Sequence, residues 1–346
     1  MLRTKSMAGG REAAVTPEIV LTLVLASLGG LALALAGLIG FALVWPRQPI
    51  RGALPRLTDD ERELAHRLRG HVTAVASVPH NLDHYPALEA AACYIERELA
   101  QMGLAPLLQE FDVAGRPVRN IEVALGPANG TGAEPATYVV GAHYDSPDDS
   151  PGANDNGTGV AALIELVRAL KDAPLRCRLH LVFFVNEEAP YGKTEVMGSL
   201  VHARSMARAG KRIDGMIALE TLGYFSDAPR TQRFPFPFGL IYPSIGNFVA
   251  FVGLPRARSF VHRTLNGFRA ETVFPSIGGI APGFLSGIDL SDHWAYDQCG
   301  FPAMMITDTA PFRNPHYHTR GDLPATVDYD SLARITAGLA RMLQRL

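Results

Sequence analysis

The chain has 346 residues, of which 47% are hydrophobic and 19% are charged, and its formal net charge at pH 7 is −2. This length is enough for one large α/β domain, or for a domain with an appendage. A chain so close to neutral lacks the basic surface of a nucleic-acid-binding protein, so we expect no nucleic-acid partner. Cys93, Cys177 and Cys299 form no CxxC pair, and their odd number and wide spacing argue against a disulfide framework or a thiolate zinc site.

A long apolar segment follows a polar tail of residues 1–18. Residues 19–45 contain no charged side chain. A helix needs about 20 residues to cross a hydrocarbon core of about 30 Å, so this segment is long enough to span a bilayer with some tilt. It is too long for the apolar core of an ordinary signal peptide, which has roughly 7 to 15 residues. We therefore predict one transmembrane helix over residues 19–45, which contacts the lipid bilayer.

The charges beside this segment do not fix its orientation. Three basic residues lie on each side: Arg3, Lys5 and Arg11 before it, and Arg47, Arg51 and Arg56 after it. The positive-inside rule compares the basic residues on the two sides of a span, and here it clearly favours neither orientation. We expect the arrangement of a signal anchor, in a single-pass membrane protein with its large domain outside the cytoplasm.

The rest of the chain alternates between helical and strand-like patterns. Residues 46–57 are rich in proline and arginine and indicate a linker, and residues 58–346 form the predicted domain. Helices are expected over 58–77, 86–102, 157–170, 197–209 and 329–346, and strands over 105–113, 119–125, 136–142, 178–185, 213–219 and 302–307. This alternation is typical of an α/β domain. Residues 224–291, rich in Pro, Gly and Phe, are expected to be a substrate-shaping insertion with one or two helices between 245 and 268.

The first chemical motif follows the strand expected over 136–142. It reads GAHYDSPDDSPGANDNGTG and contains His143, Asp145 and Asp155. An open α/β sheet places its site at the carboxyl ends of its strands, and zinc accepts imidazole nitrogen and carboxylate oxygen. Asp155 could bridge two metal ions with its two oxygens. Taken alone, Asp155 is equally consistent with the N-cap of the following helix.

Two glutamates follow the next buried strand, in the motif VFFVNEEAP. Glu187 and Glu188 repel each other at a strand end unless cations or protons lie between them, so one could bind a metal while the other moves protons. The alternative is a solvated acidic turn. Glu220 closes another apolar strand, and His316 and His318 follow the last one. Together these segments supply His, Asp, Glu, Glu and His at successive strand ends, a combination that predicts a metal centre.

At these residues the chain resembles the co-catalytic di-zinc exopeptidase family. This family includes secreted bacterial aminopeptidases, and glutaminyl cyclases and the transferrin-receptor ectodomain share its fold. The resemblance covers about residues 64–346, where the motifs GAHYDS, AxDNGTG, NEE, LETLGY, SDH and HYHTxxD appear in family order. It implies the zinc-exopeptidase (phosphorylase/hydrolase-like) fold, a three-layer α/β/α sandwich with a mixed, mostly parallel central sheet.

The resemblance also implies residue roles and two Zn²⁺ ions per chain. His143 and Glu220 would bind one zinc, Glu188 and His318 the other, and Asp155 would bridge them. Glu187 would be the general base and Tyr317 would help to hold the oxyanion. Asp145 would orient His143 as a carboxylate orients a ligating imidazole. Many family members have aspartate where Glu220 stands, and glutamate keeps the oxygen donor.

Some assignments stay open. His316 competes with His318 for the ligand role, and the HTxxD pattern favours His318 with Asp322 as its partner. Asp292 and His293 of the SDH motif are equally consistent with substrate contact and with a structural role. Nothing in the sequence indicates an oligomeric state.

The resulting prediction is an aminopeptidase that hydrolyses amino-terminal peptide bonds of a peptide substrate. Three alternatives remain: a glutaminyl cyclase with one zinc that transfers an acyl group, a carboxypeptidase or other amidohydrolase, and a catalytically silent binding module.

Overall fold

The computed structural model describes residues 16–44, 54–127, 134–235, 238–240 and 242–346. The chain divides into two compact units, Met1–Ala42 and Leu43–Leu346, which are described separately.

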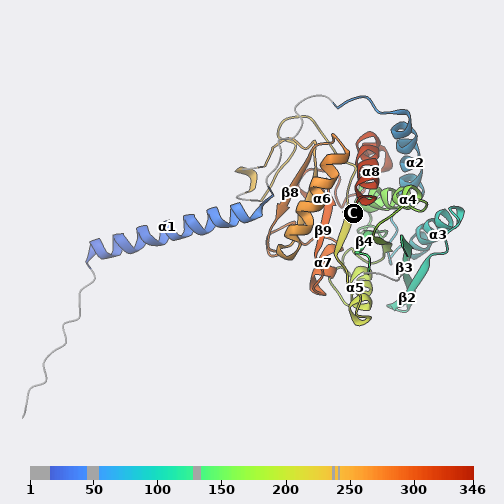
Figure 1. Cartoon of the computed structure of the whole chain (residues 1–346), viewed down its shortest axis with the longest axis horizontal. Helices are drawn as coiled ribbons and strands as arrows, with labels where there is room; N and C mark the ends of the chain where they lie inside the picture. Colours follow the sequence, from blue (N-terminus) through green and yellow to red (C-terminus); the bar gives the residue numbers. More distant parts are fainter. Residues whose placement is uncertain (1–15, 45–53, 128–133, 236–237, 241) are drawn as a thin grey trace, which may run out of the picture. The chain divides into compact units, whose positions relative to one another are not determined.

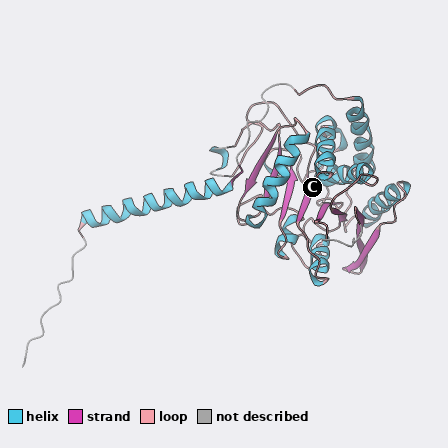
Figure 2. Cartoon of the chain, viewed as in Figure 1, coloured by secondary structure: helices cyan, strands magenta, loops and turns pink. Residues whose placement is uncertain are grey.

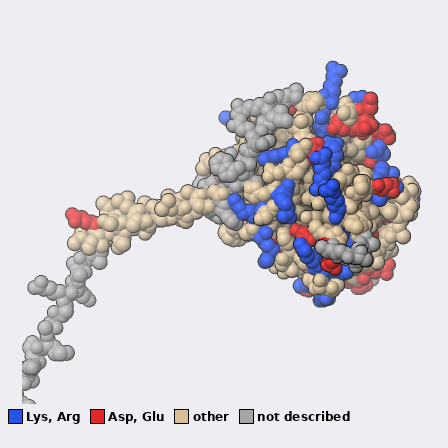
Figure 3. Space-filling model, viewed as in Figure 1, with Lys and Arg blue, Asp and Glu red and all other residues tan. Residues whose placement is uncertain are grey.

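In the first unit, the described residues form the helix α1 (Pro17–Ala42), and its side chains over residues 17–37 are exposed and mostly apolar. Figure 3 shows that its surface is uncharged beyond the acidic first turn, which contains Glu18. Within the described part of the chain, this is the one helix that is long and apolar enough to cross a membrane, over Pro17–Gly37 with a mean hydropathy of 2.5. It ends three residues before the predicted boundary at residue 45.

The second unit is built on one mixed sheet with the strand order β1-β8-β7-β9-β6-β4-β5-β3-β2 (Figure 1). The strands are β1 (Leu43–Val44), β2 (Leu107–Val113), β3 (Arg116–Leu125), β4 (Thr137–His143), β5 (Arg178–Phe184), β6 (Gly215–Glu220), β7 (Val249–Gly253), β8 (Ser276–Ile280) and β9 (Ala303–Thr307). The central strands β9, β6, β4 and β5 run parallel to one another. Antiparallel pairs flank them: β7 with β9 on one side, and β3 with β5 on the other.

Helices cover both faces of this sheet (Figure 2). They are α2 (Asp59–Val75), α3 (Tyr85–Gln101), α4 (Thr158–Leu170), α5 (Gly198–Arg208), α6 (Arg258–Glu271), α7 (His293–Gln298) and α8 (Tyr329–Leu343). Buried side chains of α2, α3, α4, α6 and α8 share one core cluster, and those of α5 and α7 share the other. The predicted three-layer α/β/α sandwich is therefore confirmed, with its parallel pairing in the centre of the sheet and in the β7-β8 pair.

The central strands are mostly hydrophobic because most of their side chains are buried, on both faces of the sheet. In β5, Leu181 and Phe183 belong to the core under α4, whereas Val182 and Phe184 belong to the core under α5 and α7. Successive side chains of a strand point to opposite faces, so a strand covered on both sides cannot alternate with polar residues. This packing holds the carboxyl ends of the central strands in fixed positions.

The segment 224–291, predicted to be a substrate-shaping insertion, also contributes to the central sheet. This segment contains the strands β7 and β8, which extend the central sheet, and the helix α6, which packs on it. The β7 sequence VAFVG has the β-branched and aromatic residues of a strand, but it is only five residues long and lies among Gly- and Pro-rich stretches. Pairing with β9 supplies the stability that such a short segment lacks alone.

Candidate metal centre

The site lies at the carboxyl edge of the parallel strands. His143 is the last residue of β4, and Glu220 is the last residue of β6. Glu187 and Glu188 follow β5, and His318 lies in the loop after β9. Asp155 lies in the turn Ala153–Gly157 that connects β4 to α4. Strand ends of a parallel sheet meet at one edge, so side chains that are far apart in sequence converge there.

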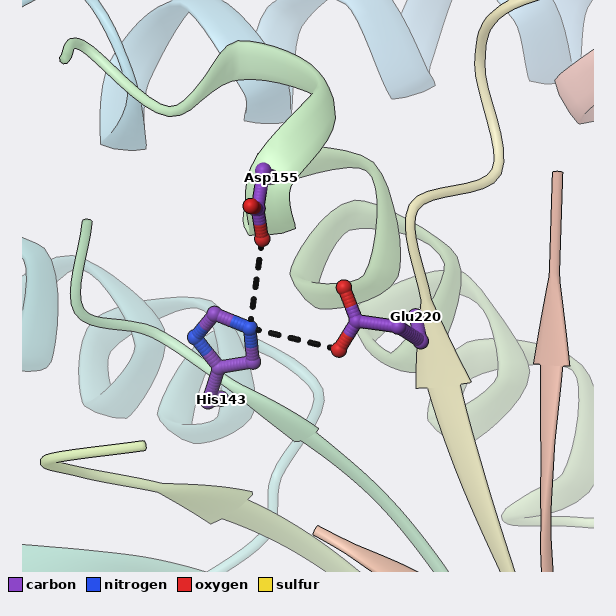
Figure 4. Close-up of side chains that lie close together, drawn as sticks. All are labelled: His143, Asp155 and Glu220. Carbon is purple, nitrogen blue, oxygen red and sulfur yellow. Dashed lines mark ion pairs between the residues drawn. The ribbon is translucent and has the colours of Figure 1, made fainter. Parts of the chain in front are cut away.

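The first group of converging atoms surrounds the His143 ring (Figure 4). Its Nε2 atom lies 3.4 Å from Asp155 Oδ1 and 3.4 Å from Glu220 Oε2. The Ser291 hydroxyl donates a 2.8 Å hydrogen bond to the same Glu220 Oε2 atom. Glu187 Oε2 lies 3.9 Å from His143 Nε2, on the border of this group.

The second group uses the other oxygen of Asp155. His318 Nε2 lies 3.0 Å from Asp155 Oδ2 and 3.5 Å from Glu188 Oε1. In each of these two groups, and in a third formed by His143, Glu187 and Glu188, the potential ligand atoms lie within 4.8 Å of one another. The two oxygens of Asp155 therefore face two different histidines, and the structure brings together all five side chains predicted as metal ligands.

The unsatisfied atoms of the site provide a test of whether metal ions fit. His143 Nε2 and Asp155 Oδ2 are buried and have no hydrogen-bond partner. Buried polar atoms are normally paired, because leaving them without a partner costs free energy. These two atoms point at neighbouring ligand atoms across gaps that a cation would bridge. Two imidazoles, two glutamates and a shared aspartate form a donor set that zinc accepts, so the residues fit two zinc ions.

The electrostatics of the site favour cations as well. Burial raises the pKa of Glu187, Glu188 and Glu220 above the usual range, and neighbouring carboxylates raise it further. Burial also acts to raise the pKa of Asp155, but the neighbouring imidazoles of His143 and His318 lower it overall. Crowded carboxylates repel one another unless positive charge lies between them.

Asp145 connects the ligands of β4 to those after β5. Its Oδ1 and Oδ2 atoms accept the backbone N–H groups of Glu187 and Glu188, both at 3.1 Å. The His143 Nδ1 atom lies 3.1 Å from the backbone oxygen of Asp145 and 3.6 Å from its carboxylate. The main chain of Asp145 is thus the direct partner of the imidazole, and its side chain holds the glutamate turn.

Asp322 lies beside Asp155 and its loop. Its two oxygens accept the backbone N–H groups of Asn154 at 2.9 Å and Asp155 at 3.0 Å. The sequence motif paired Asp322 with His318, four residues earlier, whereas these hydrogen bonds pair it with the backbone of the bridging aspartate. Asn156, which the sequence reasoning missed, accepts the N–H of Thr221 and donates to the carbonyl of Leu219. The sequence feature that could have indicated a role for Asn156 is its place next to Asp155 in the motif ANDNGTG.

The two histidines of the last motif have different surroundings. The Tyr317 ring stacks on His318 with centroids 3.9 Å apart, and burial beside the site's carboxylates raises the pKa of Tyr317. The His316 ring instead packs edge-on against Tyr224. His316 takes part in neither group of converging ligand atoms.

Asp292 and His293 of the SDH motif are fully buried. Both carboxylate oxygens of Asp292 lack a hydrogen-bond partner, and burial raises its pKa to about 7. His293 Nε2 lies 2.7 Å from the carbonyl oxygen of Ile288, and burial lowers the pKa of this imidazole to about 4. Within the SDH motif, Ser291 contacts a predicted metal ligand directly, because its hydroxyl donates to Glu220. The sequence did not predict this contact.

Comparison with known proteins supports this site. The model of peptidase family M28 matches residues 120–343, which is more than half of the chain. The chain is 36% identical over 274 residues to the uncharacterized protein YfbL of Escherichia coli K12, covering 77% of this chain and 82% of YfbL. It is 26% identical over 221 residues to a probable leucine aminopeptidase of Arthroderma otae, covering 59% of this chain and only 52% of that protein.

Solved structures share the fold at lower identity. A zinc-dependent exopeptidase from Parabacteroides distasonis superimposes with a TM-score of 0.59 at 17% identity, over 85% of this chain and all of that chain. A glutaminyl cyclase from Fimbriiglobus ruber gives a TM-score of 0.61 at 17% identity, over 86% of this chain and 99% of that chain. These two likenesses show the fold alone. The family match, and the metal-ligand geometry that lies within it, show that the chain belongs to peptidase family M28 and is a zinc metallopeptidase.

Proposed function

We propose that the chain is an aminopeptidase with a dinuclear zinc site. The observation that carries this proposal is the placement of Asp155, whose two oxygens face His143 on one side and His318 on the other. His143 and Glu220 would hold one ion, Glu188 and His318 the other, and Asp155 would be shared. The relationship to a probable leucine aminopeptidase supports an amino-terminal peptide bond as the substrate.

Glu187 is the proposed general base. Zinc held at this site supplies Lewis acidity, which activates water and polarises a scissile carbonyl. Glu187 Oε2 lies beside the first ligand group, 3.9 Å from His143 Nε2, so it can accept a proton from the attacking water and deliver it to the leaving amine. Burial raises the pKa of Glu187, which favours uptake of the proton from water.

Tyr317 is the proposed donor to the oxyanion. Its raised pKa keeps the phenol protonated, and stacking on His318 holds its ring beside the second ligand group. A protonated hydroxyl in a largely buried position can stabilise negative charge that develops on the carbonyl oxygen.

The proposed location is a membrane, with α1 as a single-pass anchor and the peptidase unit outside the cytoplasm. The length, hydropathy and uncharged surface of α1 support the anchor. Protease protection in oriented vesicles tests the orientation, and digestion of the peptidase unit from the cytoplasmic side would contradict it.

Zinc content together with turnover tests the enzymatic proposal. The unaltered chain should bind two zinc ions and cleave an unblocked leucine anilide, and acetylation of the substrate's amino group should abolish cleavage. Release of ammonia from a peptide with an amino-terminal glutamine, without anilide cleavage, would show a cyclase instead.

Two neighbouring glutamates give a matched pair of variants. Glu187→Gln should keep both zinc ions and lose most turnover, at least about 100-fold for a general base. Glu188→Gln should lower zinc affinity as well, because it removes a ligand. Unchanged turnover in Glu187→Gln would reject its assignment. Asp155→Ala should release both ions, and two retained zinc ions in that variant would contradict the bridge.

A further inference from the structure

A chain of buried polar side chains crosses the layer between the sheet and the helices α5 and α7. Tyr296 Oη lies 2.6 Å from His202 Nδ1, and His202 Nε2 lies 3.1 Å from Glu122 Oε2. The other oxygen of Glu122 contacts His180 Nδ1 at 2.5 Å. Tyr296 and His202 are buried, and neither belongs to the metal-ligand groups described above.

The charge of Glu122 sets the direction of these hydrogen bonds. Burial acts to raise its pKa, but hydrogen bonds from His180 and His202 lower the pKa to about 2, so the group is a carboxylate at neutral pH. A carboxylate only accepts, so His202 donates from Nε2. In the neutral imidazole Nδ1 is then an acceptor, and the Tyr296 hydroxyl donates to it. The hydrogen bonds therefore run from Tyr296 through His202 to Glu122, which also accepts a hydrogen bond from His180.

Tyr296 lies on the helix that positions Ser291. The backbone N–H of Trp294 donates to the carbonyl of Ser291 at 3.0 Å, which ties Ser291 to the start of α7. The Ser291 hydroxyl donates to Glu220 Oε2, the ligand oxygen that faces His143. The helix α7 has only six residues, too few to be stable alone, so its position depends on tertiary contacts such as the one between Tyr296 and His202.

The same chain of residue types occurs elsewhere in the fold, on other helices. His71 Nδ1 lies 2.7 Å from Tyr94 Oη, and His71 Nε2 lies 3.0 Å from Glu165 Oε1. These side chains join α2, α3 and α4, and Glu165 also pairs with Arg67 and Arg168. This second chain has nearly the same hydrogen-bond lengths but does not include α7, so it provides an internal control for the route through Ser291.

We propose that Tyr296 and His202 are positioning residues for the metal centre: they hold α7 so that Ser291 orients Glu220 toward the ion bound by His143. This inference rests on the proposed zinc site. It assigns a function to a buried network outside the metal-ligand groups, and it gives Ser291 the role of transmitting the position of α7 to the ligand.

The test uses the full chain and zinc itself as the probe. Tyr296→Phe removes one oxygen atom and leaves the ring packing in place, and Tyr94→Phe is its matched control. Zinc affinity is measured by competition with a chromogenic chelator. We expect Tyr296→Phe to weaken binding of one of the two ions by about tenfold, the lower end of the effect of removing an outer partner of a metal ligand. Tyr94→Phe should leave both affinities unchanged, even if it lowers thermal stability as much.

A double-mutant cycle tests the route through Ser291. Ser291→Ala should weaken the same ion, and adding Tyr296→Phe to it should cause little further loss, because the transmitting hydrogen bond is already absent. Additive losses in the double variant would overturn the proposed route. An equal loss of affinity in Tyr94→Phe would show a general stability effect and would overturn the positioning role.

The outcomes separate this inference from the proposed function. If the unaltered chain binds two zinc ions and Tyr296→Phe binds both as tightly, the positioning role is overturned and the proposed function stands. If the unaltered chain binds no zinc, the proposed function fails, and the inference fails with it.

Discussion

The carboxylate of Asp322 accepts the backbone N–H of Asp155 at 3.0 Å, although the two residues are 167 positions apart. Its other oxygen accepts the N–H of Asn154. Asp322→Asn keeps the size of the side chain but replaces one acceptor with a donor, so one buried N–H group loses its partner. We expect zinc affinity to fall by about 10- to 100-fold, the range for partners that hold a metal ligand. Chelator competition measures this change.

Asp328→Asn is the control for that prediction. Asp328 caps α8 six residues later, accepting the N–H and hydroxyl of Ser331. Its replacement should affect stability and leave zinc affinity unchanged. Equal zinc affinities for Asp322→Asn and the unaltered chain would show that Asp155 keeps its position without Asp322.

The second prediction concerns the turn that carries Glu187 and Glu188. Asp145→Asn removes an acceptor for one of their two N–H groups. Because this turn supplies both the proposed base and a proposed ligand, turnover and zinc affinity should fall together, each by about tenfold or more. Asp149→Asn, in the same loop but exposed and paired with Arg320, should change neither. Loss of turnover with full zinc affinity would limit the role of Asp145 to Glu187.

The third prediction concerns the start of α2 and separates fold stability from the site. The Thr58 hydroxyl accepts the N–H of Glu61, and the Glu61 carboxylate accepts the N–H of Thr58, which is a capping box. Thr58→Ala should lower the free energy of unfolding by about 1 kcal/mol. Thr73→Ala, at an exposed position inside the same helix, should be neutral or slightly stabilising because alanine favours helices. Urea unfolding measures both, and neither variant should alter zinc binding.

The fourth prediction is a pH dependence of stability that depends on Glu122. The pKa of this carboxyl falls from the usual 4.5 to about 2 in the folded chain, so between these values the unfolded chain binds more protons. The resulting stabilisation is fully present above pH 4.5 and is lost as the pH falls toward 2. A shift of this size corresponds to roughly 3 kcal/mol. Glu122→Gln should therefore be less stable than the unaltered chain at pH 7, and the gap should narrow in acid.

Urea unfolding of both proteins at pH 7, 5, 4 and 3 checks this prediction, with a chelator present so that zinc release does not contribute. A gap that stays constant or widens as the pH falls would contradict the assigned role of the two histidines in holding Glu122 ionised.

The sequence predicted the central architecture because its signals were local. The stretch RLHLVFFV is followed one residue later by Glu187 and Glu188. Its LVFF segment in β5 is buried on both faces, which is the pattern that indicates a covered strand. Side chains at the ends of parallel strands must then meet at one edge. The strand β7 was missed because five residues between Gly- and Pro-rich stretches carry too weak a pattern, and its stability comes from β9.

The supporting hydrogen bonds could not be predicted from local patterns. Ser291 and Glu220 are 71 positions apart, and their contact depends on where α7 packs. Asp322 lies close to His318 in sequence, which suggested a pairing, but the course of the loop directs its carboxylate to Asp155. Such contacts depend on how the loops pack against the sheet. Neither composition nor the periodicity of hydrophobic residues predicts that packing.

Asn156 joins the Asp155 turn to the end of β6 through Thr221 and Leu219. The aspartate and the glutamate that converge on His143 are thus fastened to each other by the scaffold, without help from any ion. Removal of zinc should therefore leave the side chains of Asp155 and Glu220 in the positions that bind the metal. Zinc should then rebind without a refolding step, at a rate set by the loss of its bound water.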